Sequence, residues 1–330
     1  REQIEIDPQY NEIKEETLKF FRTLQVELLI PLTMQEQLVG ILGLGKKENL
    51  QSFRIRDVEL LEHIGKQIGI TIDNALHHGD IVEKERIAEE LRLGRQIQTS
   101  LLPQTPPKIS KLSLQGLMQP AKEIGGDYYD FISLPGQDRM GIVIGDVSGK
   151  GVAAGLLMAM VKTAIHIFSS RETSPKQILI RINEILDKHI GGEKFMTMLY
   201  LIWQAAKSTL TYSSAGHEHI LVYRKSTGEV EEILSGGTIL GIVPDIDKIL
   251  EEKNIILRTG DKILLYTDGA TEARNQQKEH FGLEGLKKAF MNHSKKSAEA
   301  IMKSVKDEIY EFIGNYPQYD DITLVVLEAE

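Results

Sequence analysis

The sequence predicts an α+β protein in which antiparallel sheets form a central sandwich flanked by helices. From about residue 109 onward, short apolar strand patterns follow one another without the regular alternation of strand and helix that a parallel sheet requires. Helical patterns and one last strand pattern then complete the chain. A small α/β segment and a long helical pattern precede this region, so we expect separate parts along the chain.

Composition sets limits on size and chemistry. The 330 residues suggest two domains, at roughly 100–200 residues for each. The net charge is −9 and no run of Lys and Arg stands out, which argues against nucleic acid as a partner because such binding depends on phosphate neutralisation. The chain has no cysteine, which excludes disulfides, zinc–thiolate sites, iron–sulfur clusters and a cysteine nucleophile.

Nothing in the sequence indicates a membrane segment. No apolar run approaches the ~18 residues of a membrane span, and no signal-peptide pattern is present. The chain begins at Arg1, so we expect a cytoplasmic fragment of a longer protein, with no membrane contact in this fragment.

The N-terminal segment, residues 1–76, is expected to be a small domain. A helical-looking start precedes two apolar runs, residues 26–32 and 38–44, which a polar turn at 34–37 joins. Short apolar runs bounded by a polar turn indicate a pair of strands.

Residues 56–102 predict a long helix, and residues 77–104 are expected to be a helical linker. Apolar residues three or four positions apart form a first stripe: Leu61, Ile64, Ile68, Ile72 and Ala75. After the interruption "HHGD" a second stripe follows: Ile87, Leu91, Gly94, Ile97 and Leu101. At ~1.5 Å per residue this helix would span nearly ~70 Å, a length that favours packing against a second copy in a homodimer. The alternative is a monomer whose linker bends at Gly79.

Residues 105–330 contain the remaining elements. Strands are expected at 112–118, 128–132, 141–144, 196–203, 210–212, 220–223, 255–257, 262–266 and 322–327. Helices are expected at 152–168, 175–190, 283–292 and 297–313.

The stretch "IGDVSGKGVAAG" joins a predicted strand to a predicted helix and raises the question of nucleotide binding. A P-loop requires four residues between its glycines and a hydroxyl after its lysine, but here three residues separate Gly145 from Gly149 and Gly151 follows Lys150. Gly149, Gly151 and Ala154 match the dinucleotide pattern, yet no strand ending in an acidic residue lies about 20 residues further on. A nicotinamide enzyme is therefore disfavoured.

Acidic residues recur at the ends of predicted strands or beside glycine turns. They are Asp127, Asp146, Asp268 and the pair Asp320 and Asp321. Carboxylates at strand ends can converge in space, and oxygen-only ligands suit magnesium or manganese. Taken alone, each aspartate is more simply explained by a turn or by the flank of a strand. The four placements together favour a metal site.

Six motifs carry a family resemblance: "KEIGGDYYDF", "GDVSGKGVAAGLLMA", "FMTMLY", "SAGHEH", "LLYTDGATEA" and "DDITLVV". In this order they resemble bacterial metal-dependent serine/threonine phosphatases of the PP2C superfamily. The branch is that of the stage II sporulation phosphatase and the stress-response phosphatases that act on anti-anti-sigma factors. The resemblance extends from about Leu101 to the C-terminus, and "RQIQTSLLP" is similar to the segment that leads into this domain.

The resemblance implies a site with two Mn²⁺ or Mg²⁺ ions and a phosphorylated, anti-anti-sigma-like regulatory protein as the partner. Asp146 would bridge both ions, and the backbone carbonyl of Val147 would help to bind one of them. Asp268 and Asp320 would complete the ligands, and Asp127 would hold the second ion or its waters. Asp127 and Asp146 would thus be the catalytic residues. A water shared by two such ions has a lowered pKa and attacks phosphorus.

Three further expectations concern departures from this pattern. Asp321 is less suited than Asp320 to be a ligand, because the family's acid precedes a polar residue and then the strand. Many relatives have a histidine two residues after the bridging aspartate, where this chain has Ser148, and His217 replaces it by residue type only. Because a turn histidine is the simpler interpretation of His217, the general acid stays unassigned.

The N-terminal segment resembles the closing third of a GAF domain, a module that senses small ligands or mediates dimerisation. "LLIPLTMQEQLVGILGLGKK" is similar to its last two strands and "FRIRDVELLEHIGKQIGITIDNAL" to its final helix. A structural dimer platform is the alternative. For the whole chain, the alternative to a phosphatase is a pseudophosphatase, a binding module regulated by the GAF-like segment.

Overall fold

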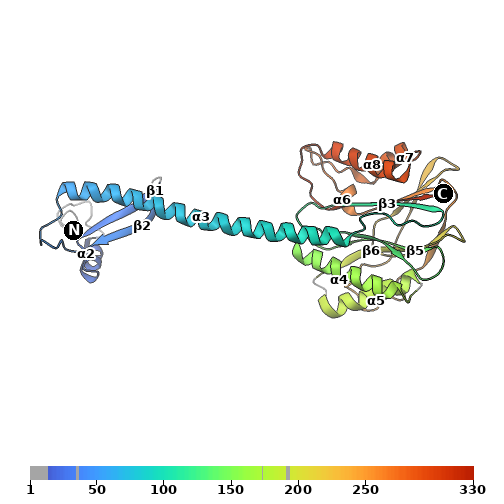
Figure 1. Ribbon diagram of the computed structural model, residues 1–330, viewed down its shortest axis with the longest axis horizontal. Coiled ribbons are helices and arrows are strands. Elements are labelled where there is room, and N and C mark those ends of the chain that lie inside the picture. The colour runs from blue at the N-terminus through green and yellow to red at the C-terminus, as the bar shows by residue number, and fades with distance from the viewer. Residues whose placement is uncertain (1–13, 35–36, 173, 191–193) are drawn as a thin grey trace. The chain divides into compact units, whose positions relative to one another are not determined.

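The computed structural model describes all residues except 1–13, 35–36, 173 and 191–193 (Figure 1). The chain forms two compact units, residues up to Glu89 and Glu90–Glu330. This boundary lies inside the segment 77–104 that we expect to be a linker.

The N-terminal unit pairs two strands beside a helix. It contains α2 (Lys14–Thr23), β1 (Leu28–Met34) and β2 (Gln37–Leu44), and the strands are antiparallel as predicted. Part of the predicted turn, residues 35–36, lies outside the described residues. Gly69 permits the following helix to approach β1, because a Cβ atom there would lie 2.7 Å from the backbone oxygen of Thr33.

The long helix α3 (Ile55–Leu101) contains 47 residues. The tetrapeptide 77–80 interrupts the apolar stripe but not the helix, since one glycine inside a helix costs only about 1 kcal/mol. The helix ends before Pro103, which has no amide hydrogen to continue the hydrogen-bond ladder.

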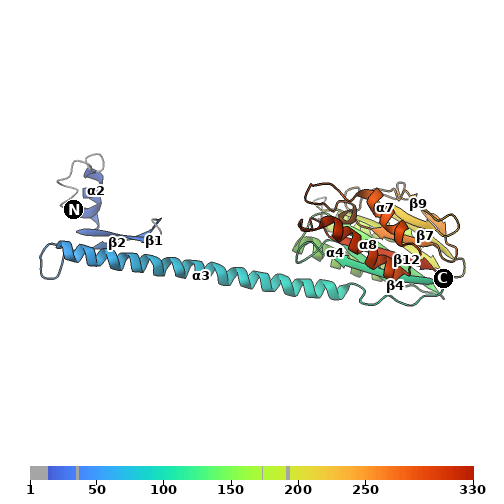
Figure 2. The ribbon, with the colours of Figure 1, turned by 90° about the horizontal axis from the view of Figure 1, so that it is seen from above.

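The larger unit is a sandwich of two five-stranded antiparallel sheets (Figures 1 and 2). The first sheet has the order β10-β7-β6-β5-β4, from β4 (Tyr128–Ser133), β5 (Arg139–Val147), β6 (Met196–Gln204), β7 (Thr209–Ala215) and β10 (Lys253–Ile256). The second has the order β3-β12-β11-β8-β9, from β3 (Leu112–Gln119), β8 (Ile220–Arg224), β9 (Glu229–Ile233), β11 (Lys262–Tyr266) and β12 (Ile322–Ala329). The predicted fold class is confirmed.

Helices cover the outer faces of the sandwich. Figure 1 shows α4 (Val152–Ser169) and α5 (Pro175–Ile190) on one side and α7 (Gly282–His293) and α8 (Ala298–Ile313) on the other. A short helix, α6 (Asp268–Thr271), follows β11 directly. Apolar side chains of both sheets form the main core, in which Ile142, Leu201 and Val325 are fully buried.

Helix α4 corrects one expectation. It is long and apolar enough to cross a membrane by length and composition, with a mean hydropathy of 1.7 over its 18 residues. Lys162 and His166 break its uninterrupted apolar run, which is why a search for such runs does not find it. In the structure Met158, Val161 and Ile165 are buried, as in a helix that packs on a sheet.

Candidate metal centre

The strand topology gathers the predicted acids at one end of the sandwich. Asp127 directly precedes β4, and Asp146 is the last residue but one of β5. These strands are antiparallel, with Tyr128 opposite Gly145, so both carboxylates lie at the same edge of the first sheet.

The second sheet repeats this arrangement. Asp268 follows the end of β11, and Asp320 lies just before the start of β12. Tyr266 of β11 is opposite Leu324 of β12, which places these two acids at one edge as well.

Hydrogen bonds join the two sheets at this end. Thr267 Oγ1 and Thr323 Oγ1, from the second sheet, donate to Asp127 Oδ2 at 2.8 Å and 2.5 Å. In return, Asp321 Oδ2 accepts a hydrogen bond from the amide of Gly126 at 2.6 Å. Asp321 Oδ1 accepts from the amide of Ala121 at 2.7 Å, so both of its oxygens hold the loop before β4.

Glycines allow this loop to pack tightly. A Cβ atom on Gly125 would lie 2.5 Å from Asp321 Oδ2, and one on Gly126 would lie 2.7 Å from the carbonyl oxygen of Val147. Any larger residue would therefore push away either Asp321 or the carbonyl that the sequence suggests as a ligand.

The acids destabilise one another's charged forms. The pKa of Asp146 is raised to about 7, mainly by burial and then by the charges of Asp268 and Asp320. A hydrogen bond with Asp127 lowers this pKa in part. Burial, followed by the charges of Asp146 and Asp321, raises the pKa of Asp127 well above its ordinary value. The cluster therefore carries more negative charge than the nearby basic groups neutralise.

The excess of negative charge extends to Asp268 and Asp320, which are more exposed than Asp127. Burial raises the pKa of Asp268 to about 6, and Asp320, Glu272 and Glu218 add to the shift through their charges. Lys150 Nζ lies 2.8 Å from Asp320 Oδ2 and is a basic residue that the sequence analysis did not assign to the site.

The donor set fits hard divalent cations. Carboxylates and the Val147 carbonyl supply oxygen only, and mutually repelling carboxylates are stabilised by a cation. Among the residues that the structure describes, no three His, Asp or Glu side chains are grouped closely enough to hold a metal ion as they stand. The chain thus brings the acids close enough for their charges to influence one another.

The hydrogen bonds that Ser148 and His217 form with described residues do not involve the acids. Ser148 holds its loop to the start of β6, because its amide donates to the Phe195 carbonyl at 2.8 Å and its Oγ accepts from the Phe195 amide at 3.0 Å. His217 is 5% exposed, and its Nδ1 lies 2.9 Å from Thr197 Oγ1. Burial lowers the pKa of His217 to about 3, so it is neutral at physiological pH.

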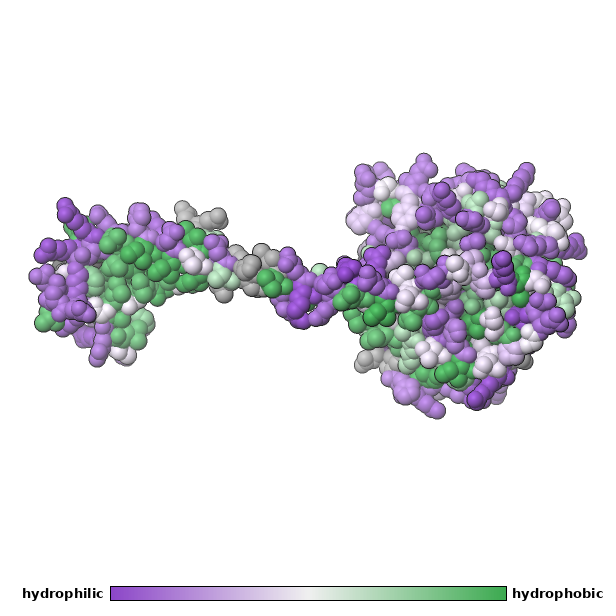
Figure 3. Space-filling view, in the orientation of Figure 1, coloured by the Kyte–Doolittle hydropathy of each residue, from purple (hydrophilic) through white to green (hydrophobic). Residues whose placement is uncertain are grey.

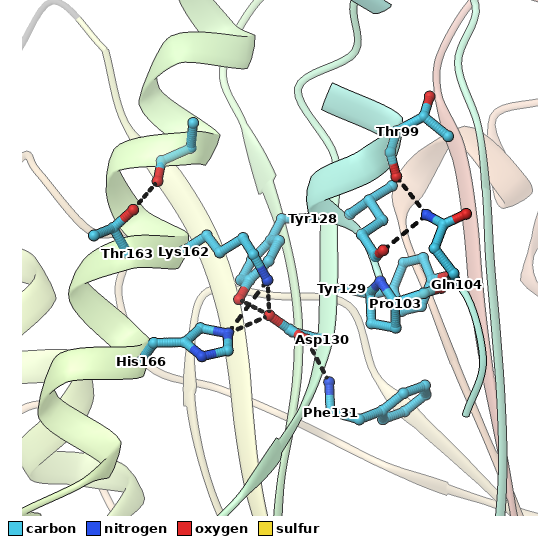
Figure 4. A network of polar contacts seen from close by, with 12 residues as sticks. Thr99, Pro103, Gln104, Tyr128, Tyr129, Asp130, Phe131, Lys162, Thr163 and His166 are labelled. Carbon is cyan, nitrogen blue, oxygen red and sulfur yellow. Dashed lines mark hydrogen bonds and ion pairs between the residues drawn. The ribbon is translucent and has the colours of Figure 1, made fainter. Parts of the chain in front are cut away.

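A second polar cluster anchors α4 to β4 (Figure 4). Asp130 accepts hydrogen bonds from Tyr128 Oη at 2.8 Å and from Lys162, and His166 Nε2 lies 2.7 Å from it. Burial raises the pKa of Asp130, but the hydrogen bonds from His166 and Lys162 outweigh it, so the pKa lies below its ordinary value. The anchored helix begins directly after the loop that contains Lys150.

The end of α3 contacts the loop before β4, a contact that the sequence did not predict. Gln98 Nε2 donates to the carbonyl of Gly125 at 2.7 Å, and the Gly125 amide donates to Gln98 Oε1 at 3.0 Å. Gly94 leaves room for Ile124, since a Cβ atom there would lie 2.8 Å from its Cδ1. Just beyond the end of the helix, Tyr129 Oη donates a hydrogen bond to the carbonyl of Pro103 at 3.3 Å. The only sequence signal was that Gln98 falls within "RQIQTSLLP".

Comparison with known proteins identifies the family of the chain. Residues 136–330 match the family model described as stage II sporulation protein E. The chain is 31% identical over 249 residues to the phosphoserine phosphatase RsbU of Bacillus subtilis, covering 75% of this chain and 72% of that protein.

Solved structures show the fold. The SiaA-PP2C domain of Pseudomonas aeruginosa has a TM-score of 0.66 at 20% identity, covering 76% of this chain and 98% of that domain. RsbX in complex with magnesium has a TM-score of 0.51 at 16% identity, covering 68% of this chain and 98% of that protein. Since the family model spans more than half of the sequence and the sandwich is that of PP2C domains, the chain belongs to the stage II sporulation protein E (SpoIIE) family.

Proposed function

We propose that the chain is a protein serine/threonine phosphatase of bacterial signalling that hydrolyses phosphoserine or phosphothreonine on a regulatory protein. The observation that carries the proposal is the gathering of Asp127, Asp146, Asp268 and Asp320 at one end of the sandwich. The identity of 31% to a phosphoserine phosphatase supports the same reaction.

The proposed site holds two Mn²⁺ or Mg²⁺ ions. Asp146 lies centrally and would contact both, the Val147 carbonyl would contact one, and Asp268 and Asp320 would complete the set. Asp127 would hold the second ion or its waters, oriented by the two threonine hydroxyls that donate to it. When bound, such ions lower the pKa of water and neutralise phosphoryl charge. The magnesium bound by the structural neighbour RsbX supports this choice of cation.

Substituting the acids tests the assignment. We expect Asp146→Asn and Asp268→Asn each to reduce Mn²⁺-dependent hydrolysis of p-nitrophenyl phosphate by more than about a thousandfold, since each removes a charge that holds a cation. Chelation with EDTA should abolish the wild-type activity. Asp130→Asn is the control, because Asp130 binds Lys162 instead. Full activity in both site variants would refute the assignment.

The partner we propose is a phosphorylated protein of the anti-anti-sigma type, as the family resemblance implies. Release of phosphate from a panel of phosphorylated candidates, compared in Mn²⁺ and Mg²⁺, identifies both the substrate and the preferred ion. A pseudophosphatase that only binds its partner is the competing function. Calorimetric titration that detects no tight Mn²⁺ binding to the wild-type chain would favour it.

We further propose that α3 mediates homodimerisation and that the N-terminal unit is a GAF-like sensor or dimerisation module. Several apolar side chains of α3 are exposed, among them Leu60, Ile64, Val82 and Ile87. Figure 3 shows apolar residues gathered on the surface of the N-terminal unit, where Leu38 and Ile41 are also exposed. Sedimentation should therefore give a dimer at micromolar concentration, and a monomer would contradict the proposal.

The contact of α3 with the site suggests how regulation would act. Gln98 binds the backbone of Gly125, two residues before Asp127. A shift of the helix end would therefore move the loop that positions this acid. Gln98→Ala should weaken Mn²⁺ binding in calorimetry without unfolding the chain.

A further inference from the structure

Lys150 contacts the rim of the proposed metal site. It lies in the glycine loop between β5 and α4, and its Nζ is 2.8 Å from Asp320 Oδ2. The same ammonium group donates to the carbonyl of Tyr319 and lies 4.7 Å from the centre of the Tyr319 ring. Arg274 approaches the same ring, with its guanidinium carbon 5.3 Å from the centre.

This ion pair distinguishes Asp320 from the other three acids. Within the described part of the chain, no salt bridge joins a basic side chain to Asp127, Asp146 or Asp268. Asp320 therefore has a positive partner in the protein, whereas Asp127, Asp146 and Asp268 have no such partner among the described residues.

The pair is more exposed to solvent than the deepest of the acids. Asp127 is 1% exposed, while the side chains of Lys150 and Asp320 are 23% and 30% exposed and Tyr319 is 65% exposed. Lys150 is therefore within reach of a solvent-borne cation or phosphoryl group at Asp320.

We propose that Lys150 and a divalent cation compete for Asp320, and that the displaced ammonium group then binds the phosphoryl group of the substrate. The proposal rests on the proposed function. A carboxylate oxygen in contact with a divalent ion is a poor partner for a second cation, because the two positive charges repel. The flexible stem of lysine allows its charge to move without moving the loop backbone.

The displaced lysine keeps two neutral contacts, the Tyr319 carbonyl and the Tyr319 ring. Neither neutralises its charge, so an incoming phosphoryl dianion becomes its natural partner. Loading with metal thereby converts Lys150 from a partner of Asp320 into part of the phosphate site. The two binding events are coupled, and by linkage the coupling is reciprocal.

Lys150→Met tests both halves of the proposal, and Arg274→Met is the matched control. Arg274 borders the same ring and its loss changes the net charge equally, but among the described residues no carboxylate forms an ion pair with it. Calorimetric titration of the metal-free chain should show Mn²⁺ binding about two- to fivefold tighter in Lys150→Met than in Arg274→Met, the range expected for a partly exposed ion pair.

The binding of inorganic phosphate tests whether Lys150 contributes to the phosphate site. Titrated into the Mn²⁺-loaded protein, phosphate should bind about three- to tenfold more weakly to Lys150→Met than to Arg274→Met. Lys150→Arg, which keeps the charge, should resemble the wild type in both titrations.

Each contrary result has a separate meaning. Equal Mn²⁺ affinity in the two methionine variants overturns the competition for Asp320. Equal phosphate affinity overturns the role of Lys150 in binding phosphate. Failure of the wild-type chain to bind Mn²⁺ would instead refute the proposed function, so the two failures are distinguishable.

Discussion

Two carboxylates three residues apart, Asp127 and Asp130, have opposite electrostatic surroundings. Both are buried, at 1% and 3% exposure. Burial and neighbouring acids raise the pKa of Asp127, whereas hydrogen bonds from His166 and Lys162 bring the pKa of Asp130 below its ordinary value despite its burial. Burial alone therefore does not determine whether a carboxylate is charged, and the partners decide.

The contrast separates a structural cluster from a site prepared for a ligand. Asp130 has its cation within the protein, so its charge holds α4 on β4. Asp127 receives only hydroxyl donors, and Asp146 beside it faces further acids. A cluster that keeps its charges unpaired reduces stability in the absence of a ligand, which is a common property of functional sites.

The largest effect is expected from breaking the paired cluster. Lys162→Met should lower the free energy of unfolding by about 2–4 kcal/mol near neutral pH, because it leaves Asp130 buried without its ammonium partner. Because the pKa of Asp130 is lowered in the folded state, its contribution is present above the unfolded pKa and is lost as the pH falls through the folded pKa. Urea denaturation measures the change, and the exposed Lys188→Met is the control. Equal stability of both variants would show that Asp130 does not depend on Lys162.

A smaller effect of opposite sign is expected from the unpaired cluster. In metal-free protein at about pH 8, Asp146→Asn should raise the free energy of unfolding by about 1–3 kcal/mol, since it removes one of several repelling charges. The folded-state pKa of Asp146 is raised to about 7, so the wild-type carboxyl stabilises the fold below its unfolded pKa and loses this contribution as the pH rises through about 7. The gain should accordingly shrink in acid. A destabilised variant at about pH 8 would contradict the comparison.

The third effect concerns the pH dependence of metal binding. A protonated carboxyl does not hold a cation, so Mn²⁺ affinity should rise by up to about tenfold per pH unit toward pH 7 and level off above it. Calorimetry in buffers of different ionisation enthalpy would detect the released proton. Asp130→Asn should keep the same slope. In the wild type the pKa of Asp130 is lowered, so Asp130 takes up no proton in this range and its loss does not change the pH dependence. A flat profile in the wild type would show that Asp146 is ionised without metal.

Much of this arrangement could be predicted from the sequence, because the acids stand at the ends of strands whose apolar patterns are clear. The edge strand β9, with the sequence "EVEEI", escaped prediction since its polar residues hide the pattern of a strand. Asp127 and Asp130 fall in one motif, "GGDYYD", and nothing local separates the acid with a cation from the acid without one. Lys162 lies 32 positions from Asp130, and Lys150 lies 170 positions from Asp320, so both pairs depend on tertiary contacts.

The continuity of α3 has a consequence for how its length can vary. Each residue inserted into a helix rotates everything beyond it by about 100° and advances it by about 1.5 Å. Gln98 contacts the Gly125 backbone from one face of that helix. Whether an upstream segment of α3 stays aligned with this contact therefore depends on the rotation of the helix between them. Inserting seven residues nearly restores the original rotation, whereas inserting two turns the following segment to roughly the opposite side. The effect of helix length on the orientation of Gln98 is therefore periodic, like the effect of DNA length on the relative orientation of two protein-binding sites.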